Sequence, residues 1–245
     1  MAGDRNASTW LVIPTYDEAA TLEAIVSAAL EQLPPDRRLL IVDDSSPDGT
    51  GDIADRIAAS RDDVEVMHRS GKQGLGPAYV AGFERALAGG AELVAQMDAD
   101  FSHDPGDLPR LLEVAERADL VLGSRYVEGG GVSDWGPLRR LISAGGSTYA
   151  RLLLGVGIRD LTGGFKVFRR QVLEAIELET IPSLGYAFQV ETTYRAVRAG
   201  FRVVEVPIVF RDRRVGESKM SGQIVAEAAL RVPAMRFGRR KPRER

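Results

Sequence analysis

The sequence contains no cysteine and only two histidines, His68 and His103. Without cysteine, disulfides and thiolate metal centres are excluded. With so little histidine, a metal site built from several imidazoles is excluded as well. A metal ion bound by this chain would be held by oxygen ligands, which favours Mg²⁺ or Mn²⁺ over zinc.

Long apolar segments are also missing. The first eight residues are polar and include no apolar core of a signal peptide. No stretch reaches the ~18 uninterrupted apolar residues that are typical of a transmembrane helix. We therefore expect a cytoplasmic protein without a membrane-spanning helix.

Two common nucleotide-binding motifs are absent. No Gly-x-Gly-x-x-Gly follows the first predicted strand, and no Gly-x-x-x-x-Gly-Lys-Ser/Thr occurs anywhere, which argues against a Rossmann dehydrogenase and a P-loop enzyme. The nearest approach to a phosphate loop is Gly-Lys-Gln-Gly-Leu-Gly at residues 71–76. It follows a predicted strand and precedes a predicted helix, and a flexible turn is an equally good interpretation of its glycines.

The chain of 245 residues, 44% hydrophobic and 27% charged, is typical of one large α/β domain. Its charge is unevenly distributed. Residues 195–245 carry 14 Lys+Arg against 5 Asp+Glu, whereas the whole chain carries 32 against 35. A basic C-terminal end indicates an anionic partner: phosphates, an acidic membrane surface or nucleic acid.

Short apolar runs alternate with helical patterns in the first half of the chain. This β-α-β order predicts a mostly parallel sheet with helices on both faces. No repeat or linker divides the chain, so we expect a single domain. The expected strands are 10–13, 39–42, 64–67, 93–97, 120–122 and 203–210. The expected helices are 21–33, 52–59, 79–88, one following Asp104 and Pro105, and an amphipathic one over 223–237. The expected loops are 128–137, which is rich in glycine, and 211–222, which is polar.

Three of these strands end directly in polar residues. In parallel sheets ligands bind beyond the carboxyl ends of the strands, so residues 14–18, 43–46 and 98–100 should converge on one cleft. The paired carboxylates of Asp98 and Asp100 suit a divalent cation that bridges a diphosphate. A simple turn after a strand is the alternative.

The other two strand ends have the composition of a nucleoside pocket. Pro14, Tyr16 and Glu18 are placed to wall a base, although Tyr16 could also be an ordinary surface aromatic. Asp43 or Asp44 could accept hydrogen bonds from a base or a ribose hydroxyl. The same Asp/Ser/Pro/Gly-rich segment could instead form a turn that caps the next helix.

Basic residues in the predicted loops favour a second phosphate site, because arginine grips phosphate oxygens in two-point contacts. Any one of them could be merely solvated, and their collection near an acidic pair is the more informative observation. These residues are Arg125, Arg139, Arg140, Arg213, Arg214 and Lys219.

At this point the sequence resembles the polyprenol-phosphate (dolichol-phosphate) mannose synthases of glycosyltransferase family 2, which have a GT-A fold. The resemblance runs from about Leu11 to Gly222. The first segments that carry it are residues 12–18 (Val-Ile-Pro-Thr-Tyr-Asp-Glu), 42–50 (Val-Asp-Asp-Ser-Ser-Pro-Asp-Gly-Thr), 71–76 and 97–103 (Met-Asp-Ala-Asp-Phe-Ser-His). The later ones are 123–126 (Gly-Ser-Arg-Tyr), 160–165 (Asp-Leu-Thr-Gly-Gly-Phe) and 216–219 (Gly-Glu-Ser-Lys).

The resemblance implies inverting transfer of mannose from GDP-mannose to a polyprenyl monophosphate. It also implies roles for single residues. The guanosine would be held by Pro14, Tyr16, Glu18 and Asp43. Mg²⁺ or Mn²⁺ would be held by Asp98, Asp100 and Ser102, the last at a position where some relatives have glutamine. The donor and acceptor phosphates would be handled by Arg125, Arg139, Arg213 and Lys219.

The same resemblance divides the chain into a nucleotide-sugar half (8–126), an acceptor half (127–222) and a basic C-terminal helix and tail (223–245). It implies a protein that lies peripherally on the cytoplasmic face of the membrane, with a membrane-anchoring partner protein or domain. Apolar residues between 138 and 158 could form surface helices that touch the bilayer or could pack on the sheet. The tail could bind anionic lipid or be an ordinary basic terminus.

Two other functions compete with this one. A UDP-glucose:polyprenyl-phosphate glucosyltransferase would use the same motifs, since the choice of base and sugar depends on the shape of the pocket. A catalytically silent nucleotide-binding protein would keep the fold, but the intact Asp98, Asp100, Arg125 and Lys219 argue against it. We expect no nucleic-acid partner, because the basic region lacks interleaved aromatic residues.

Overall fold

The computed structural model describes residues 8–183, 185–212 and 222–237. Its strands are β1 (Thr9–Thr15), β2 (Arg37–Asp43), β3 (Val64–His68), β4 (Leu93–Gln96), β5 (Leu120–Ser124), β6 (Gly131–Val132), β7 (Lys166–Arg169), β8 (Val203–Pro207) and β9 (Val209–Phe210). Its α-helices are α1 (Leu22–Gln32), α2 (Thr50–Ala59), α3 (Leu75–Ala88), α4 (Leu108–Ala115), α5 (Pro137–Leu154), α6 (Arg170–Ala175), α7 (Tyr186–Arg198) and α8 (Gly222–Phe237). Two short 3-10 helices are η1 (Pro105–Asp107) and η2 (Leu178–Thr180).

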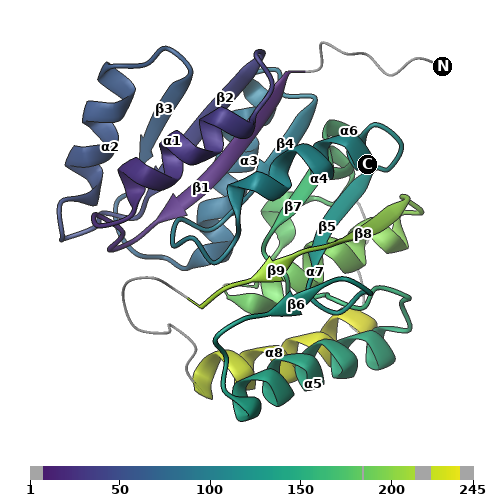
Figure 1. The fold of residues 1–245 in the computed structure, drawn as a ribbon. Coiled ribbons are helices and arrows are strands. Elements are labelled where there is room, and N and C mark those ends of the chain that lie inside the picture. The colour runs from purple at the N-terminus through teal and green to yellow at the C-terminus, as the bar shows by residue number, and fades with distance from the viewer. Residues whose placement is uncertain (1–7, 184, 213–221, 238–245) are drawn as a thin grey trace.

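One sheet forms the centre of the molecule (Figure 1). Its strand order is β3-β2-β1-β4-β7-β5-β8, and a separate pair joins β6 to β9. All neighbours in the large sheet are parallel except β7, which runs antiparallel to both β4 and β5. The predicted mostly parallel α/β architecture is therefore confirmed.

Helices cover both faces of this sheet, as its continuous apolar strands require. Side chains of α1 and α4 pack on one face, together with Ile53 and Ala54 of α2. Side chains of α3, α6 and α7 pack on the other face, around the fully buried Tyr79, Phe83 and Phe188. Because the two apolar layers cover the faces of the sheet, polar groups gather at the edge where the carboxyl ends of the strands lie.

The first half of the chain follows the expected element order, with shifts of a few residues at element ends. Residues 203–210 differ from expectation, because β8 and β9 belong to different sheets and are separated at Ile208. The segment 128–137 was expected to be a loop, yet it contains β6 and the first residue of α5. The strand β7 was not anticipated, since Lys-Val-Phe-Arg is short and has a basic residue at each end.

The second half adds a pair of helices, α5 and α8, which lie side by side at one end of the molecule (Figure 1). Ala150 and Leu154 of α5 pack against Val190 and Tyr194 of α7 and Val232 of α8. Other apolar residues of the pair face outward. They are Leu138, Leu141, Ile142, Tyr149 and Leu152 of α5 and Leu230 and Phe237 of α8. One side of α5 therefore packs on α7 and α8 and another is exposed, while its contact with a bilayer stays a prediction. Within the described residues, no helix has the length and hydropathy needed to cross a bilayer.

Lys166 of β7 is completely buried, which is rare for a lysine. Its Nζ donates hydrogen bonds to the backbone oxygen of Gln189 at 2.7 Å and to Oγ1 of Thr192 at 3.1 Å. Burial lowers the pKa of Lys166 to about 7, while the charge of Asp160 opposes this shift. The buried amine thus ties β7 to the beginning of α7, and burial favours the neutral form of this amine.

This shift predicts how stability depends on pH. The pKa of Lys166 is about 7 in the folded protein against 10.5 for the ordinary side chain, so between these values the unfolded chain binds more protons. Stability from this group is complete above the unfolded value and is lost as pH falls toward 7. Relative to Lys166→Met, the wild type should gain roughly 1 kcal/mol of unfolding free energy per unit from pH 7 to 9. Urea unfolding at several pH values measures this.

Thr192→Val is the matched control for this experiment. It removes one hydrogen bond of the amine but keeps the titrating group, so its difference from the wild type should change little with pH. A wild-type advantage over Lys166→Met that stays constant from pH 7 to 9 would contradict the assignment.

Candidate active site

The loops that follow β1 and β2 are tied together at the edge of the sheet. The backbone N–H groups of Asp17 and Glu18 donate to Oγ of Ser46 and Oγ1 of Thr50, at 3.2 and 3.0 Å. Asp17 and Ser45 both have positive φ angles, 57° and 55°, an uncommon conformation that costs free energy outside glycine. The structure thus brings the predicted base-pocket loop beside the predicted ribose-binding loop. Pro14, near the end of β1, and Tyr16 and Glu18, in the loop after β1, are all partly exposed.

The two acids at the end of β2 have different surroundings. Asp43 is buried, and its Oδ1 accepts hydrogen bonds from Oγ1 of Thr15 at 3.1 Å and from Oγ of Ser46 at 2.6 Å. Asp44 forms an ion pair with Arg69 and accepts a hydrogen bond from the backbone of Gln73. Asp44 therefore anchors the segment 71–76, whereas Asp43 supports the end of β1.

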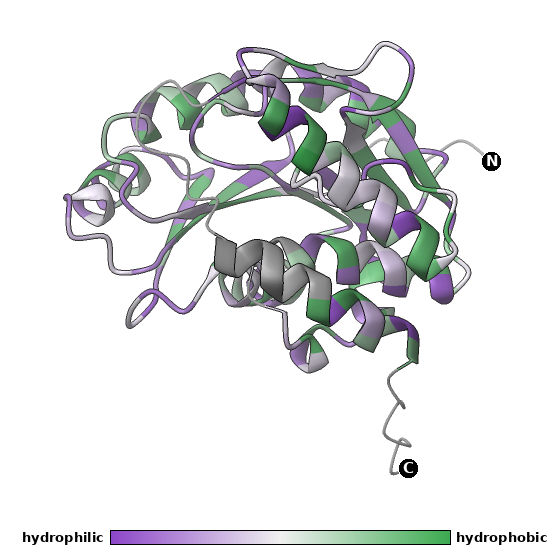
Figure 2. Ribbon diagram, turned by 90° about the horizontal axis from the view of Figure 1, so that it is seen from below, coloured by the Kyte–Doolittle hydropathy of each residue, from purple (hydrophilic) through white to green (hydrophobic). Residues whose placement is uncertain are grey.

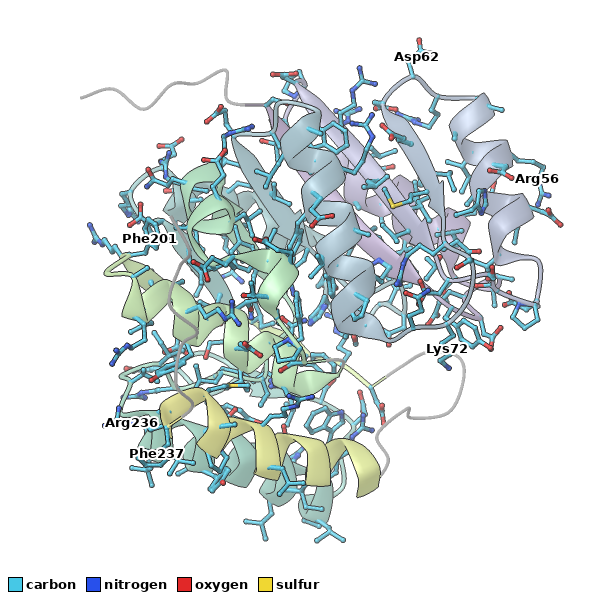
Figure 3. The ribbon with its side chains drawn as sticks, turned by 180° about the vertical axis from the view of Figure 1, so that it is seen from behind. Arg56, Asp62, Lys72, Phe201, Arg236 and Phe237 are labelled. Atoms are coloured by element: carbon cyan, nitrogen blue, oxygen red, sulfur yellow. The ribbon has the colours of Figure 1, made fainter. Side chains whose placement is uncertain are left out.

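The segment 71–76 also reaches the first loop. The Lys72 ammonium lies 3.8 Å from the centre of the Tyr16 ring, a cation–π contact that joins the loop after β3 to the loop after β1. Figure 3 shows Lys72 at the edge of the molecule, on the loop that leads into α3. Tyr16, Asp43 and Lys72 thus come from three adjacent strands and surround the carboxyl ends of that part of the sheet.

Asp98, Asp100 and Ser102 lie at the end of β4. Asp98 is partly exposed, while Asp100 is buried and its Oδ1 accepts a hydrogen bond from the Ser102 backbone at 2.9 Å. The Ser102 side chain is also buried, and its Oγ has no hydrogen-bond partner. Phe101, between them, has a φ of 61°. The turn therefore gathers three oxygen-bearing side chains into a short stretch of chain.

This set fits a divalent cation. Buried hydroxyls are normally hydrogen-bonded, so the unpaired Ser102 Oγ is a position that a ligand could satisfy. The described residues contain no group of three or more His, Cys, Asp or Glu side chains arranged to hold a metal. The set therefore suits Mg²⁺ or a similar ion that takes one or two carboxylates from the protein and further oxygens from phosphate and water.

Two further residues hold Asp98 in place, and sequence reasoning did not assign a role to either. Tyr79 of α3 donates from its hydroxyl to Oδ1 of Asp98 at 3.3 Å, and burial raises the pKa of this tyrosine well above 10. His103 accepts the Asp98 backbone N–H at Nδ1, 3.3 Å away. Its ring packs between Phe165 and Phe210, and burial lowers its pKa. The resemblance included His103, but nothing in the helical pattern of α3 distinguished Tyr79 from a core aromatic.

Arg125 does not extend into solvent as a loop arginine would. It is buried, and its Nε and Nη2 donate to the two carboxylate oxygens of Asp160 at 2.8 and 2.7 Å. Nη2 also donates to Oγ1 of Thr162 at 2.8 Å. Burial opposes the ionised form of Asp160, but the adjacent Arg125 outweighs this effect and lowers the pKa. The pair fastens the segment 160–165 to the end of β5.

Arg139 is more accessible. Its Nη1 lies 2.9 Å from both carboxylate oxygens of Asp212, and its guanidinium lies 4.3 Å from the centre of the Trp135 ring. Of the four cations predicted to bind phosphate, Arg125 and Arg139 are both paired with an acid. The other two, Arg213 and Lys219, lie outside the described residues, and so does Arg214.

The Arg125–Asp160 pair leads to a prediction about stability. Removing one partner of a buried ion pair leaves an uncompensated charge, so Arg125→Met should lower the free energy of unfolding by roughly 3–5 kcal/mol. Replacing both residues, as in Arg125→Met with Asp160→Leu, should cost less than the sum of the single changes. Urea unfolding of the four proteins measures the coupling.

Arg139→Met provides the matched control. Its pair with Asp212 is partly exposed, so the loss should be about 1 kcal/mol or less. Equal losses for Arg125→Met and Arg139→Met would contradict the contrast drawn between a buried pair and an accessible one.

Known proteins match this chain over most of its length. Over 221 residues the chain is 50% identical to the undecaprenyl-phosphate mannosyltransferase of Micrococcus luteus, covering 90% of each chain. It is 51% identical to the polyprenol monophosphomannose synthase of Mycolicibacterium smegmatis over 227 residues, which are 91% of this chain and 85% of the relative.

Solved structures share the fold at lower identity. Glucosyl-3-phosphoglycerate synthase of Mycobacterium tuberculosis, in complex with Mn²⁺, UDP and phosphoglyceric acid, superposes with a TM-score of 0.69 at 20% identity. The match covers 94% of this chain and 80% of the synthase. The expected GT-A arrangement is therefore confirmed. The model of glycosyl transferase family 2 matches residues 10–177, and the chain therefore belongs to that family.

Proposed function

We propose that this protein transfers mannose from GDP-mannose to a polyprenyl monophosphate, with inversion at the anomeric carbon. One observation carries the proposal: about 50% identity, over nine tenths of this chain, to two relatives named for mannose and polyprenyl phosphate. The acids gathered at the ends of the strands support a nucleotide-sugar donor that binds at that edge of the sheet. We assign the donor to residues 8–126 and the acceptor to residues 127–222.

On this proposal the loops after β1 and β2 hold the guanosine. Pro14, Tyr16 and Glu18 line the base, and Asp43 accepts hydrogen bonds from the nucleoside. The hydrogen bonds from Thr15 and Ser46 hold the Asp43 carboxylate in a fixed orientation, which reduces the entropy lost on binding.

Asp98, Asp100 and Ser102 would hold Mg²⁺ or Mn²⁺, whose positive charge would neutralise the diphosphate as it departs. Structures of the mycobacterial synthase with Mn²⁺ or with Mg²⁺, both with UDP, support this choice of ion. The Tyr79 hydroxyl holds the Asp98 carboxylate, and the His103 ring holds the Asp98 backbone. Because burial keeps the Tyr79 hydroxyl protonated, it remains a hydrogen-bond donor to that carboxylate.

The acceptor requires no strong general base, because a phosphate monoester is already ionised near pH 7. The protein must instead bring two anions together, and basic side chains lower that repulsion. Arg139 is suited to this role, since its ion pair with Asp212 is partly exposed. A phosphate can replace Asp212 as the partner of the guanidinium. Arg213 and Lys219 belong to the same proposal by resemblance. Arg125 would act from its buried position, by holding the segment 160–165.

We also assign the outward apolar residues of α5 and α8 to the membrane surface from which the lipid acceptor is drawn. Leu141 and Leu152 are 70% and 71% exposed, and they share one side of α5 with Leu138. Figure 2 views this side of the molecule and shows the two helices next to each other, with hydrophobic residues on both. The same two helices also carry Arg140, Arg151 and Arg236, and basic residues there suit an anionic lipid surface. Figure 3 shows Arg236 beside Phe237 at this end.

The first experiment supplies labelled GDP-mannose, Mg²⁺ or Mn²⁺ and undecaprenyl phosphate in detergent, and identifies the lipid product. We expect mannosyl transfer that requires the ion, and a loss of at least roughly 100-fold for Asp100→Ala, since it removes a metal ligand. UDP-glucose in parallel reactions tests the competing function. Preference for UDP-glucose, or transfer unaffected by Asp100→Ala, would overturn this part of the proposal.

The second experiment measures co-sedimentation with vesicles of phosphatidylglycerol and phosphatidylcholine. Exposed leucines gain free energy on entering the interface, so the triple change Leu138→Ser, Leu141→Ser and Leu152→Ser should weaken binding by on the order of 100-fold. Val209→Ser changes an exposed apolar residue of β9 and should have little effect. Equal binding by the triple variant and the wild type would exclude this surface.

A further inference from the structure

A buried glutamine in α7 has an amide group without a partner. Gln189 is only 1% exposed, and its Nε2 makes no hydrogen bond. Unpaired buried amides are uncommon, because each costs the hydration of its N–H groups. Neither the sequence motifs nor the proposed function gives this residue a role. The unpaired group is therefore a candidate contact for a ligand.

The orientation of the amide follows from its neighbour, Gln96 of β4. The backbone oxygen of Gly164 can only accept, so the atom of Gln96 that lies 2.7 Å from it is the donor, Nε2. The same Nε2 lies 2.8 Å from Gln189, which must therefore present its Oε1 to Gln96. The NH₂ group of Gln189 consequently faces the other way.

Asp98, one of the carboxylates of the site, lies on that side of Gln189. A Cβ placed on Gly164 would lie 3.6 Å from Nε2 of Gln189, 3.7 Å from Oδ1 of Asp98 and 3.4 Å from Cε1 of His103. Because Gly164 has no side chain, a space of about the size of a methyl group remains between the unpaired amide, Asp98 and His103. We call this space the Gly164 recess.

The backbone of Gln189 is held firmly in place. Its carbonyl oxygen accepts hydrogen bonds from Lys166 Nζ and from the hydroxyls of Thr192 and Thr193. The Lys166 contact ties the first turn of α7 to β7, the strand that follows Gly164, and the two threonine contacts lie within α7. The side chain therefore points into the Gly164 recess from a rigid support, as a binding group requires.

We propose that Gln189 Nε2 donates a hydrogen bond to a phosphate oxygen of the lipid acceptor in the Gly164 recess, an inference that rests on the proposed function. An amide NH₂ offers donors only, which matches an anionic oxygen. Asp98 lines the same recess, and the metal ion proposed there would offset its charge. The uncharged amide adds no further negative charge, whereas a second carboxylate at this position would repel the incoming phosphate. Gln189 would thus position the nucleophile next to the donor bound at Asp98.

The test compares Gln189→Met and Gln189→Glu with the wild type in the mannosyl-transfer assay. Losing a hydrogen bond to a charged oxygen should lower kcat/KM for polyprenyl phosphate by roughly 10- to 100-fold. The loss should be larger for Gln189→Glu, whose carboxylate repels the acceptor. The KM for GDP-mannose should stay within about twofold, because the donor is held elsewhere.

Gly164→Ala tests the recess without touching Gln189. The added methyl makes only ordinary van der Waals contacts, so the fold should persist while the space is filled. We expect the same acceptor-specific loss with an unchanged midpoint of urea unfolding. Val190→Ala, a buried change in the same helix on the side that packs against α5 and α8, should leave both kinetic constants near wild type.

Wild-type kinetics in both Gln189→Met and Gly164→Ala would overturn the inference, and so would a loss confined to the KM for GDP-mannose. If the wild type itself transfers no mannose, the proposed function fails first, and the two failures are distinguished. Equal losses for Val190→Ala would indicate a packing effect and would also count against Gln189 as a substrate contact.

Discussion

The arrangement of the site depends on one reversal of direction in the sheet. β7 inserts antiparallel between β4 and β5, with Lys166 opposite Gln96. Because β7 enters the sheet from the edge at which β4 ends, the residues just before it lie beside the acids that follow β4. Gly164 therefore meets Asp98, and Asp160 meets Arg125. A fully parallel sheet would place this segment at the far edge.

The insertion of β7 also buries several polar groups. The contacts that satisfy these groups fix the arrangement of the chain around the site. Lys166 satisfies its amine on α7, and Arg125 and Asp160 satisfy one another. Each unmet polar group in such a region would cost several kcal/mol, so these contacts admit few alternative arrangements. Against this background two of the unpaired buried atoms, Ser102 Oγ and Gln189 Nε2, are informative. Both lie close to Asp98 or Asp100, and both become explicable if substrate and metal complete the set.

Charge is divided across the molecule in a way that suits two anionic ligands. The acids cluster at the ends of β2 and β4, where a metal and a nucleotide are proposed. Accessible basic residues such as Arg139 and Arg140 lie on or near α5, whose leucines face outward. A lipid phosphate that arrives from a membrane surface would thus meet positive charge before it reaches the acids. Such a separation of charge steers an anionic ligand first to the basic side of the molecule.

Local chemistry by itself determined the alternating strands and helices of the first half, because apolar periodicity and strand-end acids are properties of consecutive residues. It also determined that Asp43, Asp98 and Asp100 would share one edge, since neighbouring parallel strands end together. Only the tertiary structure decided that Arg125 is buried against Asp160 and that Tyr79 supports Asp98. Only the tertiary structure, likewise, directs Gln189 toward Gly164. Such contacts join residues that are tens of positions apart, and their geometry is set by packing and by the need to satisfy buried polar groups, neither of which a linear pattern records.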